Sequence, residues 1–185
     1  MRLKTDLSKF YNSWYDPGAG LIKRTLWYFT NALFFLNPYF PFSSLKVILL
    51  RIFGANIGKG VVIKPRVNIK YPWKLTIGDF TWIGEQAWID NLDKVQIGAN
   101  CCLSQGAMLL CGSHDYGKIS FDLITKPITL EDGAWIGAFA VVCPGVRCET
   151  HSVLAVSSVA TKHLEAWSVY QGNPAVRKRP RMVNV

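Results

Sequence analysis

Apolar side chains recur at every sixth position over much of this chain. The recurring positions are Ile57, Ile63, Ile69, Ile77, Ile83, Ile89, Ile97, Leu103, Leu109, Leu130, Ile136, Val142, Cys148, Leu154 and Ala160. Gly often follows the aliphatic residue directly, and a small or β-branched residue often stands four positions after it. The alternation of a β-sandwich has a period of two and does not predict Gly after each sixth aliphatic residue. A period of six is typical of a parallel β-helix, in which each hexad forms a short strand and a corner.

Three hexads make one triangular turn of 18 residues, and the pattern predicts about five turns: 57–74, 77–94, 97–114, 130–147 and 148–165. In each hexad we expect the aliphatic side chain to point inward and Gly to tolerate the dihedral angles of the corner. No turn can bury its apolar face alone, so the turns should stack around one continuous core. The sequence therefore predicts a mainly β fold, with a parallel β-helix over 57–165.

Residues 1–56 lack the six-residue period. The stretch 21–36 is rich in Leu, Trp, Tyr and Phe and should form a helix that ends at the Asn-Pro pair after it. A second helix should begin at a capping Ser43 or Ser44 and end just before Gly54. We therefore expect an N-terminal helical segment in front of the β-helix.

These two helices allow two roles. Neither stretch reaches the ~18–20 apolar residues that are needed to span a bilayer. We expect the helices to cap the open end of the β-helix or to pack on a neighbouring subunit. The alternative is peripheral contact with a membrane through residues 21–53. The residues suited to that contact are Trp27, Phe34, Phe35, Lys23 and Arg24.

Residues 166–185 are predicted to form a basic C-terminal tail outside the repeat. The period is lost from His163 onward, and the Gly-Asn-Pro sequence at 172–174 is typical of a chain-breaking turn. Lys and Arg then cluster between 177 and 181.

Charge and composition narrow the possible partners. The formal net charge is +9, half of the residues are hydrophobic and 18% are charged. The apolar content indicates surface that is hidden in an oligomer. The positive charge suits a polyanion, which can be a nucleic acid, an anionic lipid or a phosphorylated ligand. No nucleic-acid-binding motif accompanies the basic residues, and we expect no nucleic-acid partner.

Cysteine usage points to a reducing compartment. The five Cys residues are odd in number, form no C-x-x-C motif and often fall on repeat positions. Buried free thiols are therefore expected rather than a disulfide framework or a zinc site. Residues 1–14 contain no apolar core of a signal peptide. Both features fit the cytosol.

The one long interruption of the repeat, residues 115–129, should mark a site. A loop of that length within a compact repeat is usually functional or disordered, and this one carries side chains that can pack. His114 stands at its root, where we expect the rigid wall of the β-helix. A neutral imidazole at that place can take a proton from a hydroxyl group near pH 7. We therefore predict that His114 is catalytic.

Several segments together resemble the hexapeptide-repeat acyltransferases. They are the hexads, Gly-Ser-His-Asp-Tyr at 112–116, Lys-Pro-Ile at 126–128 and Gly-Asn-Pro-Ala at 172–175. Within that family the chain resembles the colanic acid acetyltransferase (WcaF) group of sugar and polysaccharide O-acetyltransferases, also at 50–59 and 71–75. The hexads alone specify only the fold. The segment around His114, taken with both flanks, is more specific.

The resemblance implies a left-handed β-helix, a homotrimer, and acetyl-CoA bound as acyl donor in a groove between neighbouring prisms. It implies that His114 is the general base toward a sugar hydroxyl, whose oxygen attacks the thioester directly. It places these residues at the cofactor: Trp135, Ala138, Val156, Thr161 and Lys162, with Arg177 or Arg179 at its phosphates. Family members often have Gly or Ala near Val156, so the pantetheine arm has less room there. No metal is expected.

Polar residues near the histidine are candidates for acceptor binding. Asp90 and Asn91 lie one turn before it, on a similar side if the turns stack in register. They could bind acceptor hydroxyls or orient the imidazole, but an Asp-Asn pair is equally common in a corner turn. Asp115 could also orient the ring, Tyr116 could contact the acceptor, and Glu85 is a further candidate.

The function predicted in this way is O-acetyl transfer from acetyl-CoA to a sugar hydroxyl in exopolysaccharide or cell-surface polysaccharide biosynthesis. We expect it in the cytoplasm, where the inner face of the membrane is one location that these features allow. An antibiotic O-acetyltransferase and a non-catalytic β-helix binding protein are the alternatives. A zinc carbonic anhydrase of the same fold needs three His ligands, two of them close in sequence. His114, His151 and His163 include no such pair.

Overall fold

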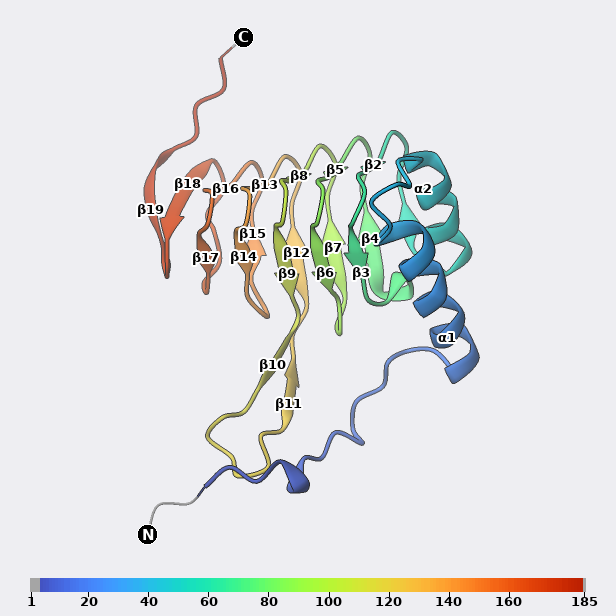
Figure 1. The fold of residues 1–185 in the computed structure, drawn as a ribbon. Helices are drawn as coiled ribbons and strands as arrows, with labels where there is room; N and C mark the ends of the chain where they lie inside the picture. The colour runs from blue at the N-terminus through green and yellow to red at the C-terminus, as the bar shows by residue number, and fades with distance from the viewer. Residues whose placement is uncertain (1–3, 185) are drawn as a thin grey trace.

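Short parallel strands stack into three sheets, and the chain winds around them to form a three-sided prism (Figure 1). The computed structural model describes residues 4–184. Face A consists of β1 (Asn56–Ile57), β4 (Leu75–Ile77), β7 (Val95–Ile97), β12 (Ile128–Leu130) and β15 (Arg147–Cys148). Face B consists of β2 (Val62–Ile63), β5 (Trp82–Ile83), β8 (Cys102–Leu103), β13 (Trp135–Ile136), β16 (Val153–Leu154), β18 (Ser168–Gly172) and β19 (Ala175–Pro180). Face C consists of β3 (Asn68–Ile69), β6 (Trp88–Asp90), β9 (Met108–Leu110), β14 (Val141–Val142) and β17 (Val159–Ala160).

The six-residue period is confirmed by the register of the strands. Ile57 pairs with Ile77 in face A. In the same parallel register, Ile63 pairs with Ile83 in face B and Ile69 pairs with Ile89 in face C. Every predicted inward side chain, from Ile57 to Ala160, is at most 5% exposed. Burying one Ile or Leu side chain stabilises the fold by ~1.5–3 kcal/mol. One apolar column therefore runs through the prism and holds its turns together.

The prism has one more partial turn than the five expected. Leu164 bridges to Cys148 in face A, and β18 pairs in parallel with β16 in face B. Leu164 and Tyr170 are six residues apart and both are buried, so they continue the inward column. The prediction that 166–185 lies outside the repeat was therefore wrong for β18. Leu164 comes only four positions after Ala160 instead of six, and this shortened hexad hid the continuation.

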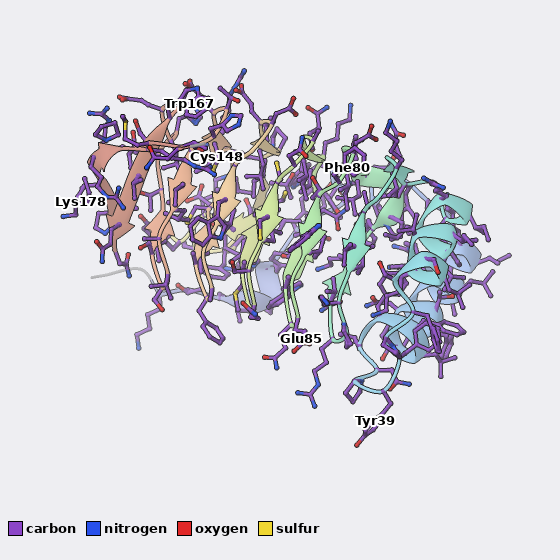
Figure 2. All side chains as sticks on the ribbon, turned by 90° about the horizontal axis from the view of Figure 1, so that it is seen from above. Tyr39, Phe80, Glu85, Cys148, Trp167 and Lys178 are labelled. Carbon is purple, nitrogen blue, oxygen red and sulfur yellow. The ribbon has the colours of Figure 1, made fainter. Side chains whose placement is uncertain are left out.

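The last strand turns back on the prism. Strand β19 pairs antiparallel with β18, and the two are joined by Asn173 and a cis Pro174. The basic residues of the C-terminal segment therefore lie on an ordered edge strand of face B, with Lys178 far from the N-terminal helices in Figure 2.

The Gly residues that follow the inward-pointing aliphatic residues allow neighbouring turns to stack closely. A left-handed φ is found three positions after the inward residue, for example at Gln86 (φ 60°) and Asn100 (φ 55°), and not at Gly84. A Cβ on Gly84 would lie 2.7 Å from the carbonyl oxygen of Leu103 in the next turn. We predicted that these Gly residues are needed for the backbone dihedral angles of the corners, and this prediction was wrong. Gly is needed there because the backbone of the neighbouring turn leaves no space for a side chain.

Replacing Gly84 by Ala should therefore destabilise the prism. The added methyl group forces the turns apart, and overpacking of this kind costs ~1–3 kcal/mol. In a chain of this length each kcal/mol lowers Tm by roughly 2–4 °C. Thermal unfolding followed by circular dichroism measures the change. Gly20→Ala is the control, because a Cβ there meets nothing within 4 Å. Equal Tm values for the two variants would contradict the stacking explanation.

The N-terminal helices cover the open end of the first turn (Figure 1). Helix α1 (Leu21–Thr30) continues into the π-helical turn η2 (Asn31–Phe35), and α2 (Ser43–Ile52) follows. Trp27 donates its indole N–H to the carbonyl oxygen of Ile69 at 2.8 Å. Lys46 is fully buried and donates to the carbonyl oxygen of Lys64 at 2.9 Å. Its burial lowers the pKa of Lys46 to about 8.

The start of α2 differs from the prediction. Phe42, and neither Ser43 nor Ser44, occupies the N-cap position. The Ser43 hydroxyl instead accepts a hydrogen bond from the backbone N–H of Ile63 at 2.8 Å, so it joins the helix to the first turn. Gly54 lies just past the helix end with a φ of 97°, as expected for a C-terminal glycine.

The long interruption of the repeat is an ordered β-hairpin. Strand β10 (Gly112–His114) pairs antiparallel with β11 (Leu123–Thr125), and the hairpin projects from the edge between faces C and A (Figure 1). The chain leaves the prism after Cys111 and rejoins face A at β12. The predicted loop 115–129 therefore starts earlier, and His114 lies on the projecting hairpin rather than on the wall of the prism.

The five cysteines are free thiols. Cys101, Cys111 and Cys148 are buried, whereas Cys102 and Cys143 are partly buried. Burial raises the pKa of Cys111 to about 12 and that of Cys101 to about 11. These thiols stay protonated and fill space in the core, as the sequence predicted.

Candidate active site

A cavity of about 420 Å³ lies where the hairpin leaves the prism. Its wall comes from the N-terminal segment, from the first two turns and from the hairpin. The lining residues are Phe10, Asn12, Tyr15, Lys70, Tyr71, Asp90, Leu92, Gly112, Ser113, His114 and Leu123. Three parts of the chain that are distant in sequence therefore meet around the histidine.

The hairpin holds the His114 ring in one orientation. The ring stacks on Phe121, with 4.4 Å between centroids and an interplanar angle of 9°, and Phe10 lies 5.9 Å away on a tilted plane. Nδ1 lies 2.9 Å from the carbonyl oxygen of Phe121. A carbonyl oxygen only accepts, so in the neutral ring Nδ1 carries the hydrogen and Nε2 keeps a free lone pair. Within residues 4–184 no hydrogen bond to Nε2 competes for that lone pair.

Asp90 lies in the same cavity, as its place one turn before His114 suggested. It is the last residue of β6, near the edge between faces C and A, and its side chain is 15% exposed. Its Oδ1 lies 3.1 Å from Nζ of Lys70 in the turn before. The two charges give the cavity a polar part of its wall beside the aromatic residues.

Asn91 is placed differently from the prediction. Its side chain is fully buried, with Oδ1 accepting from the backbone N–H of Tyr71 at 2.9 Å and Nδ2 donating to the Tyr71 carbonyl oxygen at 2.6 Å. All of its hydrogen-bonding groups therefore brace the preceding turn. Acceptor binding by Asn91 is contradicted, because the side chain does not reach the cavity.

Three further candidates also lie outside the cavity. The Asp115 carboxylate accepts from the backbone N–H of Gly117 at 3.1 Å and does not contact the imidazole. Tyr116 is 88% exposed beyond the cavity. Glu85 lies at the edge between faces B and C, as Figure 2 shows, and the histidine is at another edge. The orienting partner of His114 is instead the Phe121 carbonyl.

The N-terminal segment is the part of the site that the sequence did not reveal. Residues 4–20 run from α1 to the tip of the hairpin, where the backbone N–H of Asp6 donates to Ile119 at 2.9 Å (Figure 1). The Tyr15 hydroxyl donates to the carbonyl oxygen of Leu92 at 2.8 Å, and burial raises the pKa of Tyr15. The aromatic residues near the N-terminus were the only hint of this contact in the sequence. A contact with a hairpin about 100 residues away in the chain does not produce a repeating pattern that the sequence could show.

A second groove, of about 630 Å³, lies on face B and its edge with face C. Four predicted cofactor residues meet there: Trp135, Ala138, Val156 and Arg179. The indole N–H of Trp135 donates to the Ser104 hydroxyl at 2.9 Å, which holds the ring at the groove wall. The sequence missed the other polar and flexible lining residues, which are Ser104, Gln105, Arg181 and Met182.

The remaining predicted cofactor residues lie elsewhere. Thr161 and Lys162 are exposed at the edge between faces C and A, the same edge from which the hairpin projects, but two turns closer to the C-terminal end of the prism. Arg177 is held within the chain, because its Nε donates to the Ser168 hydroxyl at 2.9 Å and lies 3.3 Å from the Glu165 carboxylate. The predicted cofactor residues of one chain therefore do not all lie at one site. The groove and His114 of the same chain lie at different edges of the prism.

The histidines of the described part of the chain stand apart from one another. The His151 ring stacks on Trp167 at 4.1 Å, and His163 Nδ1 accepts from the backbone N–H of Arg147 at 3.0 Å. Among residues 4–184, no group of three or more His, Cys, Asp or Glu side chains is placed to hold a metal ion.

No helix in that range is long and apolar enough to cross a membrane.

Comparison with known proteins establishes the family. No family model matches the chain. The chain is 38% identical over 177 residues to the colanic acid biosynthesis acetyltransferase WcaF of Escherichia coli (strain K12), covering 96% of this chain and 97% of that protein. The chain belongs to the WcaF family of acetyltransferases. It is also 29% identical over 131 residues to nodulation protein L of Rhizobium leguminosarum bv. viciae, covering 69% of this chain and 68% of the relative.

Solved structures of acetyltransferases have the same fold. A hexapeptide-repeat acetyltransferase from Vibrio cholerae matches with a TM-score of 0.79 and 22% identity, over 90% of this chain and 96% of the other. A structure of galactoside acetyltransferase with coenzyme A matches with a TM-score of 0.75 and 23% identity, over 86% and 80%. The predicted left-handed parallel β-helix and the predicted enzyme class, acetyltransferase, are thus confirmed.

Proposed function

We propose that this acetyltransferase moves the acetyl group of acetyl-CoA to a sugar hydroxyl during exopolysaccharide or cell-surface polysaccharide biosynthesis, with His114 as general base. The observation that carries the proposal is the tautomer of His114. The Phe121 carbonyl oxygen accepts the hydrogen bond from Nδ1–H, and the lone pair of Nε2 remains available in a ring that lines a cavity of polar and aromatic side chains. The free thiols fit action in the cytosol.

The reaction is a direct acyl transfer. The acceptor hydroxyl gives its proton to Nε2 of His114 while its oxygen attacks the carbonyl carbon of the thioester. The C–O bond forms, the C–S bond breaks, and the leaving thiolate receives the proton from the imidazolium to become the free thiol. The histidine is then neutral again. General base catalysis contributes ~10²–10⁴-fold, and holding both substrates in one cleft supplies more.

The cavity is suited to a sugar ring. Phe10, Tyr15 and Tyr71 offer flat apolar surface, and Asp90 with Lys70 offers a hydrogen-bond acceptor and donors beside them. Small-molecule sites combine apolar walls with a few placed polar groups in this way. Asp90 is therefore proposed to bind an acceptor hydroxyl beside the one that reacts.

The groove on face B is proposed to bind acetyl-CoA. A solved structure of the Vibrio cholerae acetyltransferase contains acetyl-CoA, and that of galactoside acetyltransferase contains coenzyme A. Arg179 lines the groove, and Lys178 lies on the same strand, β19. Positive charge is therefore available for the cofactor phosphates. Trp135 and Val156 form an apolar wall for the pantetheine arm, and Ala138 leaves room between them.

The separation of the two sites within one chain favours a homotrimer. His114 lies at the edge between faces C and A, whereas the groove lies at the edge between faces B and C. A neighbouring prism in a closed ring can set its groove beside the first prism's hairpin. The exposed Thr161 and Lys162 at the hairpin edge then face the same cofactor from the other side.

An assay of thiol release from acetyl-CoA against a panel of acceptors tests the proposed function. The panel contains nucleotide sugars, lipid-linked sugars, oligosaccharides and chloramphenicol. We expect release of coenzyme A only with a carbohydrate acceptor, with an O-acetyl ester in the product by mass spectrometry. Turnover with chloramphenicol alone, or binding of acetyl-CoA without turnover on any acceptor, would contradict the proposal.

A further inference from the structure

The outer surface of the N-terminal helices is apolar and has no partner within the described chain. We call it the cap face, and its exposed residues are Ile22, Leu26, Phe29, Leu33, Leu36, Leu45, Ile48 and Ile52. The first five are spaced by three or four positions and so form one stripe along α1 and η2. The opposite sides of the helices bury Trp27, Phe35 and Leu50 against the prism. The stripe therefore points away from the fold that it caps.

Aromatic residues border this apolar stripe. Tyr28 is 70% exposed, Tyr39 is 91% exposed and Phe42 is 62% exposed. Figure 2 shows Tyr39 projecting outward beyond the helices at this end of the prism. Rings with an apolar body and a polar tip are enriched where proteins meet the headgroup region of a bilayer.

The positive charge of the chain is concentrated at the same end. Nine of the 21 Lys and Arg residues lie in 17–78, which holds none of the 12 Asp and Glu residues. The twelve basic and twelve acidic residues elsewhere cancel, so the whole formal net charge of +9 belongs to the helices and the first turn. Lys64 and Arg66 are exposed at its rim and form no ion pair within residues 4–184. This combination is complementary to an apolar surface that carries negative charge.

We propose that the cap face docks on an anionic lipid bilayer, with the exposed side chains of the stripe inserted at the headgroup boundary and the basic rim on the lipid phosphates. Helices that lie in the interface have this pattern of one apolar side and flanking Lys or Arg. A second copy of the chain is a poor occupant, because pairing two such ends would bring their positive charges together. No helix in residues 4–184 can cross the bilayer, so the contact is peripheral.

The docked orientation also places the acceptor cavity close to the lipid surface. Tyr71 lines the cavity of His114, and it also lines a hollow bordered by Leu21, Tyr28 and Phe29 of α1. The cavity of His114 and the hollow beside α1 therefore share the Tyr71 side chain in their walls. Binding to lipid itself needs neither His114 nor acetyl-CoA, so it can be tested independently of the proposed function.

Sedimentation with extruded vesicles tests the proposal. Vesicles of phosphatidylglycerol and phosphatidylcholine should bind the full chain at least about tenfold more strongly than phosphatidylcholine alone, and added salt should weaken that binding. The double variant Ile22→Gln/Phe29→Gln keeps the charge but removes two exposed apolar side chains. Its partition should fall by about tenfold for each side chain. Both residues are exposed, so Tm should remain that of the unchanged protein.

The matched control is Val176→Gln/Phe139→Gln, which removes two exposed apolar side chains far from the cap face. It should partition like the unchanged protein. Equal loss in both double variants, or no binding to anionic vesicles, would overturn the proposal. A lower oligomer mass of the cap variant in lipid-free sedimentation would also overturn it and assign the face to a second copy.

Discussion

His114→Ala should lower the rate of acetyl transfer by about 10²–10⁴-fold. The variant removes the one ring nitrogen that is free to accept the hydroxyl proton in the cavity. The groove on face B lies at another edge of the prism, so the affinity for acetyl-CoA should stay near that of the unchanged protein. Steady-state kinetics with the best acceptor measures the first quantity, and calorimetric titration with acetyl-CoA measures the second.

His163→Ala is the matched control for that experiment. His163 is exposed and its Nδ1 accepts from the backbone of Arg147, away from both cavities. Its removal should leave kcat within about threefold of the unchanged value, because it touches neither substrate. Near-normal turnover in His114→Ala, or equal losses in both variants, would rule out the general base.

Ala138→Trp should abolish most binding of acetyl-CoA. The large indole would occupy the groove beside Trp135 and Val156, where the pantetheine arm is expected. Loss of that enclosed contact should raise the Kd by about 100-fold or more, which corresponds to ~2.7 kcal/mol. Titration calorimetry measures the Kd. Ala32→Trp, at an exposed position in η2, is the control and should bind like the unchanged protein.

Mixing the two inactive variants tests whether the site spans two subunits. Chains with His114→Ala and chains with Ala138→Trp are refolded together in equal amounts. If one subunit supplies the base and its neighbour supplies the groove, about a quarter of the sites combine two intact halves. Thiol release should then recover to about that fraction. No recovery in a mixed oligomer would show that both residues serve one site within the same chain.

The period in the sequence was sufficient for the fold because it records a local and repeated requirement. Each sixth side chain must fit the same column, and the observed burial from Ile57 to Ala160 follows it. The same reasoning failed where spacing changed. The short step from Ala160 to Leu164 concealed the partial sixth turn, to which β18 belongs.

The candidate site was predictable only in part. The break in the period drew attention to His114, which lines the cavity at the hairpin, and the resemblance to known enzymes led to Trp135 and Ala138 in the groove. Asn91 showed the opposite outcome, because a buried amide that braces Tyr71 has the same sequence signal as one that binds a ligand. Only its two hydrogen bonds distinguish these roles.

The sequence by itself determined the parallel β-helix, the capping helices, the place of the interruption and the excess of positive charge. These features depend on side-chain periodicity and composition along a continuous stretch of chain. The tertiary structure alone decided that residues 4–20 close the cavity, that Phe121 orients the histidine and that the groove lies at a different edge of the prism. Each of these depends on contacts between segments distant in sequence, and such contacts leave no period for the sequence to show.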